Sequence, residues 1–146
     1  MKAYIASSWF TPTAFEEVET IKSLLTKNGF DYFSPKDFFV CPPTADLKTQ
    51  RETFEGNVEH ILGNDFVICN TRDKDMGSIF EAGVAFQSDT PIVYFCAGLP
   101  EGATFNLMLA QSGAKVCTSF DELDDYLSRC SDLSMLLHEP YYGSIE

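Results

Sequence analysis

Two carboxylates stand close together in the stretch DKDMGSIFEAGVAF, residues 73–86. Glu81 lies within an apolar, helix-like run, Asp75 stands just ahead of that run, and Gly77 between them lets a ligand approach the backbone. Burial of a carboxylate without a partner is costly. Paired carboxylates suit glycosidic chemistry, in which one attacks or stabilises an anomeric carbon. The plainer alternative is that Asp75 caps the helix and Glu81 faces solvent, because acidic first turns are common.

Aromatic residues form a second feature, around the first apolar run of the chain. Trp9 and Phe10 directly follow that run, and flat rings suit stacking on a planar base. Tyr4, inside the run, places a hydroxyl near the same region. The alternative for all three is an ordinary buried position, because aromatic side chains bury large areas. Neither a G-x-G-x-x-G nor a Walker A pattern is present, and no arginine cluster is placed to clamp a phosphate, so a planar, uncharged ligand is favoured.

Apolar runs that alternate with helical patterns predict the scaffold for these residues. Thr13 and Glu16 have the spacing of a capping box at the start of the first helix, and Asn28 with Gly29 ends it. A loop rich in Phe and Pro is expected over 35–47, and long loops in small domains are often functional. The expected strands are 3–7, 31–34, 65–70, 91–96 and 114–117. The remaining expectations are helices over 47–62, after Asp75, over 104–112 and over 121–129 (capped by Ser119), and a turn over 97–103.

This order of elements predicts an α/β fold, flavodoxin-like or Rossmann-like. We expect a single domain over residues 1–146, with a five-stranded parallel sheet and helices on both faces. In such sheets ligands bind beyond the carboxyl ends of the strands. Trp9, Phe10 and Asp75 all follow expected strands, so they meet at that edge.

Composition narrows the classes of partner. The chain has 146 residues and a net charge of −12, with its lysines and arginines scattered rather than clustered. Nucleic acids and anionic membranes need a basic footprint, so neither is expected as a partner. The longest apolar run, 92–97, is far shorter than the ~20 residues of a membrane span.

Cysteine and histidine usage gives no sign of a disulfide framework or a metal site. The five cysteines form no CxxC pair, and Cys69, Cys96 and Cys117 lie in apolar runs as small buried side chains. A reducing cytoplasm fits this usage. His60 and His138 have no companions at ligand spacing, so we expect no metal.

Three motifs together resemble the nucleoside 2-deoxyribosyltransferase family, over nearly the whole chain. YIASSWFT, from Tyr4, is similar to the family's first strand and the aromatics after it. DMGSIFEAG, 75–83, resembles the D-x-G-(T/S)-x-x-E-x-G signature, and FNLM, 105–108, resembles an Asn-Leu-Met segment. The resemblance implies an enzyme of nucleotide salvage that acts on deoxynucleosides and free nucleobases without a cofactor.

The resemblance also implies roles for individual residues. Glu81 matches the nucleophile that forms a covalent 2-deoxyribosyl-enzyme intermediate with overall retention, Tyr4 matches the residue that orients it, and Asp75 matches an acidic residue that helps hold the nucleoside. The expected substrate-binding residues are Trp9, Phe10, Asn57, Gly77, Asn106, Met108 and Glu146.

Two of these positions depart from the family pattern, and a third implies an assembly. Asn57 stands where many members carry Asp for base recognition or protonation. Glu146 stands near a family position where a terminal Tyr carboxylate enters the site. Asn106 matches a residue supplied from a neighbouring subunit, so the resemblance implies a homo-oligomer, a dimer or hexamer, with shared active sites.

Two other functions fit the same fold. Relatives with this signature hydrolyse 2′-deoxynucleoside 5′-monophosphates, although SSWFT after the first strand and Asn106 favour a nucleoside. A non-catalytic nucleotide-binding domain is the other alternative, because a fold alone does not determine function.

Overall fold

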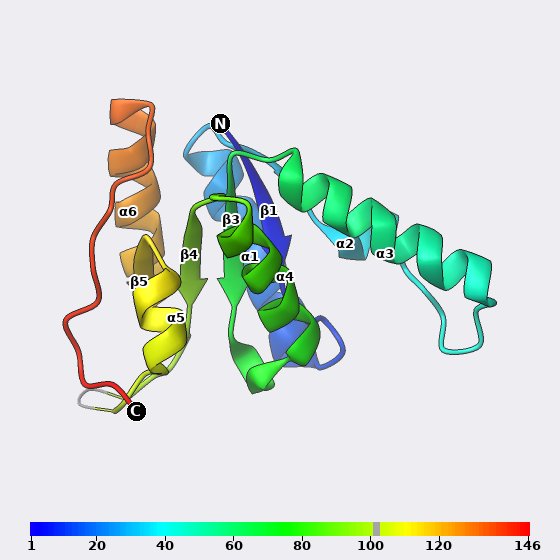
Figure 1. Cartoon of the computed structure of the whole chain (residues 1–146). Coiled ribbons are helices and arrows are strands. Elements are labelled where there is room, and N and C mark those ends of the chain that lie inside the picture. The colour runs from blue at the N-terminus through cyan, green and yellow to red at the C-terminus, as the bar shows by residue number, and fades with distance from the viewer. Residues whose placement is uncertain (101–102) are drawn as a thin grey trace.

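One parallel sheet of five strands forms the framework of the computed structural model, which describes residues 1–100 and 103–146 (Figure 1). The strands lie in the order β2-β1-β3-β4-β5, and every neighbouring pair is parallel. The expected α/β fold is confirmed, and each expected strand is present with ends that differ by at most one residue. The strands are β1 (Lys2–Ala6), β2 (Asp31–Phe33), β3 (Phe66–Asn70), β4 (Ile92–Phe95) and β5 (Lys115–Cys117).

Strand side chains alternate between two buried faces, and helices cover both. Ile5 and Ile68 face the layer of α1 and α6, whereas Tyr4 and Val67 face the layer of α3, α4 and α5. The order of strands reverses direction at β1, which pairs with both β2 and β3, so the ligand crevice is expected beyond the carboxyl ends of β1 and β3. The helices are α1 (Pro12–Lys27), α2 (Pro35–Phe38), α3 (Leu47–Leu62), the 3-10 turn η1 (Arg72–Lys74), α4 (Met76–Gln87), α5 (Leu107–Ser112) and α6 (Phe120–Leu133).

Two helix starts differ from the sequence-based expectation. The Thr11 side chain, not that of Thr13, caps α1 by accepting a hydrogen bond from Ala14 N at 3.2 Å. Pro12 occupies the first helical turn, where its fixed φ is already helical, so the cap falls just ahead of it. α5 begins at Leu107 rather than at 104, because Phe105 forms a parallel bridge with Ile145 of the C-terminal tail.

The segment 35–47 is not a loop throughout. Its first residues form α2, and the remainder, 39–46, leads into α3. Phe39 packs near Phe33 of β2 and His60 of α3, and Figure 1 shows the residues that follow, 40–46, reaching the outer end of α3, away from α4. Within α3, all of which is described, Ile61 is the one buried residue.

The remaining expectations concern turns, thiols and membrane spans. The turn over 97–103 includes 101–102, which lie outside the described residues. All five cysteines are free, and Cys69 and Cys117 are buried whereas Cys96 is only partly so. Among the helices of the described residues, none has the length and apolar character to cross a membrane.

Candidate active site

The Tyr4 hydroxyl donates a hydrogen bond of 2.6 Å to Oε1 of Glu81. Tyr4 is fully buried in the middle of β1 and faces α4. Glu81 lies about one and a half turns into α4, a helix that packs on β1 and β3. Glu81 therefore turns toward the sheet, and not outward into solvent as the plainer interpretation has it.

Burial changes the acidity of both partners. Desolvation raises the pKa of Glu81 to about 7, the hydrogen bond from Tyr4 opposes this rise, and the negative charge of Asp75 adds to it. Desolvation and the neighbouring Glu81 raise the pKa of Tyr4 well above its ordinary value. Tyr4 therefore stays protonated as a donor while Glu81 titrates near neutral pH. Such a perturbed carboxyl beside a fixed donor is typical of functional sites.

Asp75 is the N-cap of α4, as one of the sequence-based alternatives has it. Its Oδ2 accepts hydrogen bonds from the backbone N of Ser78 at 2.8 Å and from the Ser78 hydroxyl at 2.7 Å. A Cβ atom at Gly77 would stand 3.2 Å from the same Oδ2, so glycine gives this carboxylate room. Asp75 thus combines a structural bond to its own helix with an electrostatic effect on Glu81.

The aromatic pair lies in the loop that follows β1, at the carboxyl edge of the sheet. Phe10 is 78% exposed and Trp9 is partly buried, with ring centroids 5.1 Å apart. A core position is therefore excluded for Phe10. Ser7 and Ser8, just before the pair, are buried.

Asn57 lies on α3, the helix that packs against α4. Its Oδ1 is buried and has no hydrogen-bond partner among the described residues. A buried acceptor without a donor is costly, and its partner is commonly a water or a ligand.

Asn106, Met108 and Glu146 form a separate group, which the structure does not join to Tyr4 and Glu81. All three line a cavity of about 390 Å³ at the carboxyl edge, together with Lys74 at the end of η1. Asn106 caps α5 through Oδ1, which accepts hydrogen bonds from the backbone N of Met108 at 3.0 Å and of Leu109 at 3.3 Å. A second cavity of about 430 Å³ shares Met108 and Leu109, so the two form one groove between α4 and α5.

The tail that brings Glu146 to this group had no sequence signal. The backbone N of Phe105 donates to the Ser144 carbonyl at 2.9 Å, and that of Glu146 donates to the Phe105 carbonyl at 3.0 Å. The Thr104 hydroxyl also donates to the Glu146 side chain at 3.3 Å. Pairing between segments so distant in sequence has no local pattern to reveal it.

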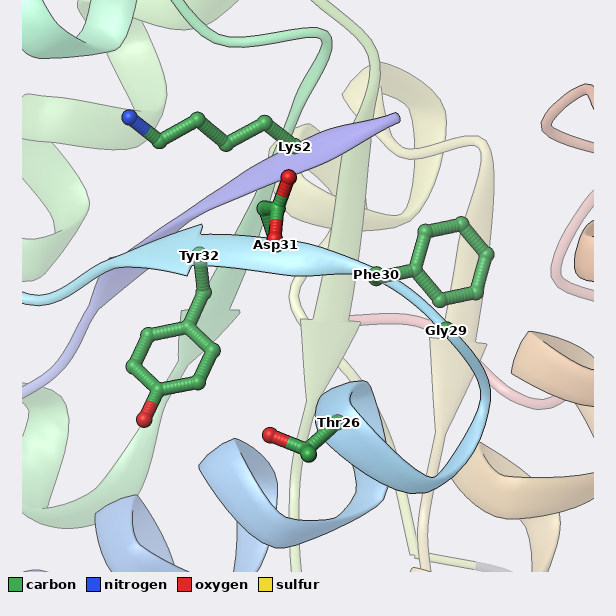
Figure 2. Close-up of a pocket in the computed structure, with 6 residues that line it drawn as sticks. All are labelled: Lys2, Thr26, Gly29, Phe30, Asp31 and Tyr32. Carbon is green, nitrogen blue, oxygen red and sulfur yellow. The ribbon is translucent and has the colours of Figure 1, made fainter.

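A larger cavity of about 540 Å³ lies at the opposite edge, where β1 and β2 begin (Figure 2). In Figure 2 the amine of Lys2 and the hydroxyl of Tyr32 lie on different sides of β2, so these two polar groups do not point to one common place. Because parallel sheets bind ligands at their carboxyl edge, volume alone does not make this cavity the site.

Sequence reasoning also missed a polar cluster on the α1 face of the sheet. Glu17 is 5% exposed and pairs with Arg72 and with Asn70, which is 1% exposed. A signal was present, because Glu17 falls within the apolar stripe of Ala14, Val18 and Ile21 on α1.

A half-buried carboxylate that accepts a hydrogen bond from a buried tyrosine lies in this α/β fold at the point where the strand order of the parallel sheet reverses, which is where such folds bind their ligands. The chain belongs to the nucleoside 2-deoxyribosyltransferase family, whose sequence profile matches residues 3–115. No match is found among curated protein sequences.

Several solved structures have the same fold as this chain. A 2-deoxyribosyltransferase of Bacillus psychrosaccharolyticus superposes with a TM-score of 0.80 at 24% identity, covering 97% of this chain and 99% of that one. A conserved protein of Enterococcus faecalis V583 gives 0.68 at 14% identity, covering 88% and 98%. A CMP N-glycosidase of Clostridium botulinum gives 0.60 at 12% identity, covering 88% and 99%. At these identities the superpositions establish a common fold.

Proposed function

We propose that this protein transfers a 2-deoxyribosyl group between nucleobases through a covalent ester with Glu81. The observation that carries the proposal is the 2.6 Å hydrogen bond from Tyr4 to a half-buried carboxylate whose pKa lies near 7. Membership of the deoxyribosyltransferase family supports the same reaction class.

In the first half-reaction the Glu81 carboxylate attacks C1′ of a deoxynucleoside. Tyr4 engages Oε1, so Oε2 is the oxygen available for attack. As the C–O bond forms, the C1′–N bond breaks and the base departs with the electron pair and takes up a proton. The carboxylate stabilises the positive charge that develops on the sugar, and this charge develops readily because 2-deoxyribose lacks an electron-withdrawing 2-hydroxyl.

In the second half-reaction a nitrogen of the incoming base attacks C1′ and Glu81 leaves as a carboxylate. The incoming base gives up a proton, which balances the one taken by the first base. Two inversions at C1′ give overall retention. Transfer prevails over hydrolysis when the acceptor is positioned and water is excluded.

The nearby residues fit supporting roles. Trp9 and Phe10 offer flat surfaces for a base at the strand edge. The Asn57 amide pairs with the base edge but cannot act as an acid at neutral pH. Asp75 uses Oδ2 for its helix and presents its other oxygen to the nucleoside.

We also propose that a second copy of the chain completes each site. Asn106 and Met108 line a groove apart from Glu81, and Met108 is 74% exposed. The outer loop, 40–46, lies away from α4 of the same chain (Figure 1). In this proposal the corresponding loop of a neighbouring copy supplies the cover that excludes water. Phe54 on α3 and Phe80 on α4 pack together and remain more than half exposed, as expected for an interface.

Base exchange tests the proposal directly. Purified protein is incubated with deoxyinosine and adenine, and the products are separated. The parent forms deoxyadenosine, and Glu81→Ala forms none above the uncatalysed background. Base exchange by Glu81→Ala at a rate near that of the parent would show that Glu81 is not the nucleophile.

A nucleotide N-glycosidase is the second candidate, and Lys74 favours it. Its side chain helps line the 390 Å³ cavity beside Thr71 and Thr104, a setting that suits a phosphate. Deoxyinosine and its 5′-monophosphate separate the two candidates. The hydrolase is supported if base is released only from the 5′-monophosphate and at a rate that does not depend on an acceptor base.

A further inference from the structure

Glu17, Asn70 and Arg72 form a buried polar cluster on the face of the sheet opposite to Tyr4. Glu17 belongs to α1, whose apolar side chains pack with Ile5 and Ile68, whereas Tyr4 packs in the cluster with Ala82 of α4. The cluster therefore lies across the sheet from the Tyr4–Glu81 pair, and it has no place in the reaction described so far.

Arg72 is the centre of this cluster. Its Nε lies 3.0 Å from both carboxylate oxygens of Glu17, and its Nη2 donates to Oε1 of Glu17 and, at 3.4 Å, to the Ala97 carbonyl. Asn70 closes the cluster: its Nδ2 donates to Oε2 of Glu17 at 2.9 Å and its Oδ1 accepts from the backbone N of Arg72 at 3.0 Å. This fork-like engagement fixes both the side chain and the backbone of Arg72.

The loop that Arg72 opens has an unfavourable backbone conformation. Asp73 and Lys74, which follow, have φ values of 58° and 52°. Residues with side chains rarely adopt these values, so the loop needs support from its surroundings. Thr71 supports one end, because its backbone N and its hydroxyl both donate to the Phe95 carbonyl, at 2.9 Å and 3.3 Å. The backbone N of Lys74 donates to the Thr71 carbonyl at 3.1 Å, and the Arg72 side chain adds the bonds to Glu17 and Ala97.

The loop leads directly to the residues of the candidate site. The Arg72 carbonyl accepts a hydrogen bond from the backbone N of Asp75 at 3.3 Å. Asp75 in turn caps α4 through Ser78, and α4 carries Glu81. A continuous series of contacts thus runs from Glu17 on one face of the sheet to Glu81 on the other.

We propose that Glu17 and Arg72 are positioning residues, which hold the 71–75 loop so that Asp75 and Glu81 keep their places relative to Tyr4. The proposal rests on the role of Glu81 in the proposed function. A buried ion pair is by itself weak evidence for stability, and an apolar pair of similar volume is often equally stable. Stability and positioning can therefore be separated by substitution.

The test compares three variants. Arg72→Met breaks the ion pair with Glu17, and the double variant Glu17→Met with Arg72→Met replaces the ion pair by apolar side chains. Arg72→Lys keeps the positive charge but lacks the several N–H donors of the guanidinium group. Lys27→Met is the matched control, because Lys27 also belongs to α1 and pairs with Asp124 at the exposed surface. For each variant kcat and KM of base exchange, the melting temperature, and hydrogen exchange of residues 71–78 are measured.

Positioning predicts a kcat lower by about 10- to 100-fold in Arg72→Met and in the double variant, because small misplacements of a nucleophile are costly. The double variant melts above Arg72→Met, because it leaves no unpaired buried charge, but below the parent, because the buried Asn70 amide loses its acceptor. Its hydrogen exchange over 71–78 is nevertheless as fast as that of Arg72→Met, Arg72→Lys falls between, and Lys27→Met matches the parent. The proposal would be overturned if kcat and melting temperature of the double variant both rose back toward the parent values. It would also be overturned if hydrogen exchange over 71–78 were the same in the variants and the parent. Hydrogen exchange does not depend on turnover, so it decides the positioning role even if Glu81 proves not to be the nucleophile.

Discussion

Tyr4 and Glu81 are 77 positions apart in the sequence, and the Tyr4 hydroxyl lies 2.6 Å from Oε1 of Glu81. One residue comes from the middle of β1 and the other from α4, so the fold itself brings them together. The bond has a direction that matters chemically. Tyr4 keeps its proton and stabilises the ionised carboxylate, which is the form able to attack a sugar carbon.

Replacing Tyr4 by phenylalanine removes this donor and keeps the ring. Because the bond lowers the pKa of Glu81, its loss moves that pKa above about 7. We expect kcat/KM at pH 7 to fall by about 10- to 100-fold, the usual worth of a hydrogen bond to a charged group. Tyr94→Phe is the control, since Tyr94 is equally buried on the same face but bonds to Ser112. A pH profile with the same midpoint in Tyr4→Phe and the parent contradicts the assignment.

The pKa of Glu81 also predicts how stability depends on pH. Folding raises this pKa from 4.5 to about 7, so the folded chain binds the proton more tightly than the unfolded chain. The resulting stability is fully present below pH 4.5 and is lost as pH rises through about 7, up to about 3 kcal/mol in all. Glu81→Gln, which cannot ionise, avoids this loss. Urea unfolding at pH 5 and pH 8 checks this prediction. The free energy of unfolding of Glu81→Gln should rise relative to that of the parent between pH 5 and pH 8. A difference between variant and parent that is the same at both pH values would contradict it.

Two substitutions of Asp75 can separate its role as the cap of α4 from its role in the proposed reaction. Asparagine is as good a cap as aspartate, so Asp75→Asn should keep the bond to Ser78 and the melting temperature. Loss of the charge lowers the pKa of Glu81, so the expected fall of about 10-fold in kcat/KM reflects a weaker hold on the nucleoside by the neutral amide. Asp75→Ala should lose the cap as well, at about 1 kcal/mol. Thermal melting and base-exchange kinetics are measured on both variants. Full activity in Asp75→Asn would assign Asp75 to the helix alone.

Asn57 carries a buried Oδ1 without a partner in the described part of the chain. Replacing it by alanine removes that unsatisfied oxygen, so the free energy of unfolding should change by less than about 1 kcal/mol. If the amide binds the base, KM for the acceptor base should rise several-fold. Asn64→Ala is the control, because its Oδ1 is also buried and has no partner within residues 1–100 and 103–146, but lies just before β3, at the other edge of the sheet. Equal KM values in both variants argue against base recognition by Asn57.

The sheet was largely predictable from sequence, because alternating apolar runs and helical patterns predicted all five strands. The pairing of Tyr4 with Glu81 was implied only by the family resemblance, since the residues alone left open whether Glu81 faces solvent. The features that were missed depend on contacts over long distances in sequence. Phe105 leaves the expected helix because it pairs with Ile145, and Glu17 is buried because Arg72 reaches it from another element. The first contact has no local signature, and for the second the apolar stripe around Glu17 indicates burial but does not identify Arg72 as the partner.

The most direct test of the covalent account is to trap the ester. The parent is mixed with deoxyinosine without an acceptor, quenched in acid, digested and analysed by mass spectrometry, with Glu81→Gln treated in parallel. The account predicts a single peptide heavier by one 2-deoxyribosyl unit, with the sugar on Glu81, in the parent only. An active parent whose sugar is found on another residue, such as Asp75, or equally on the Glu81→Gln variant, contradicts it.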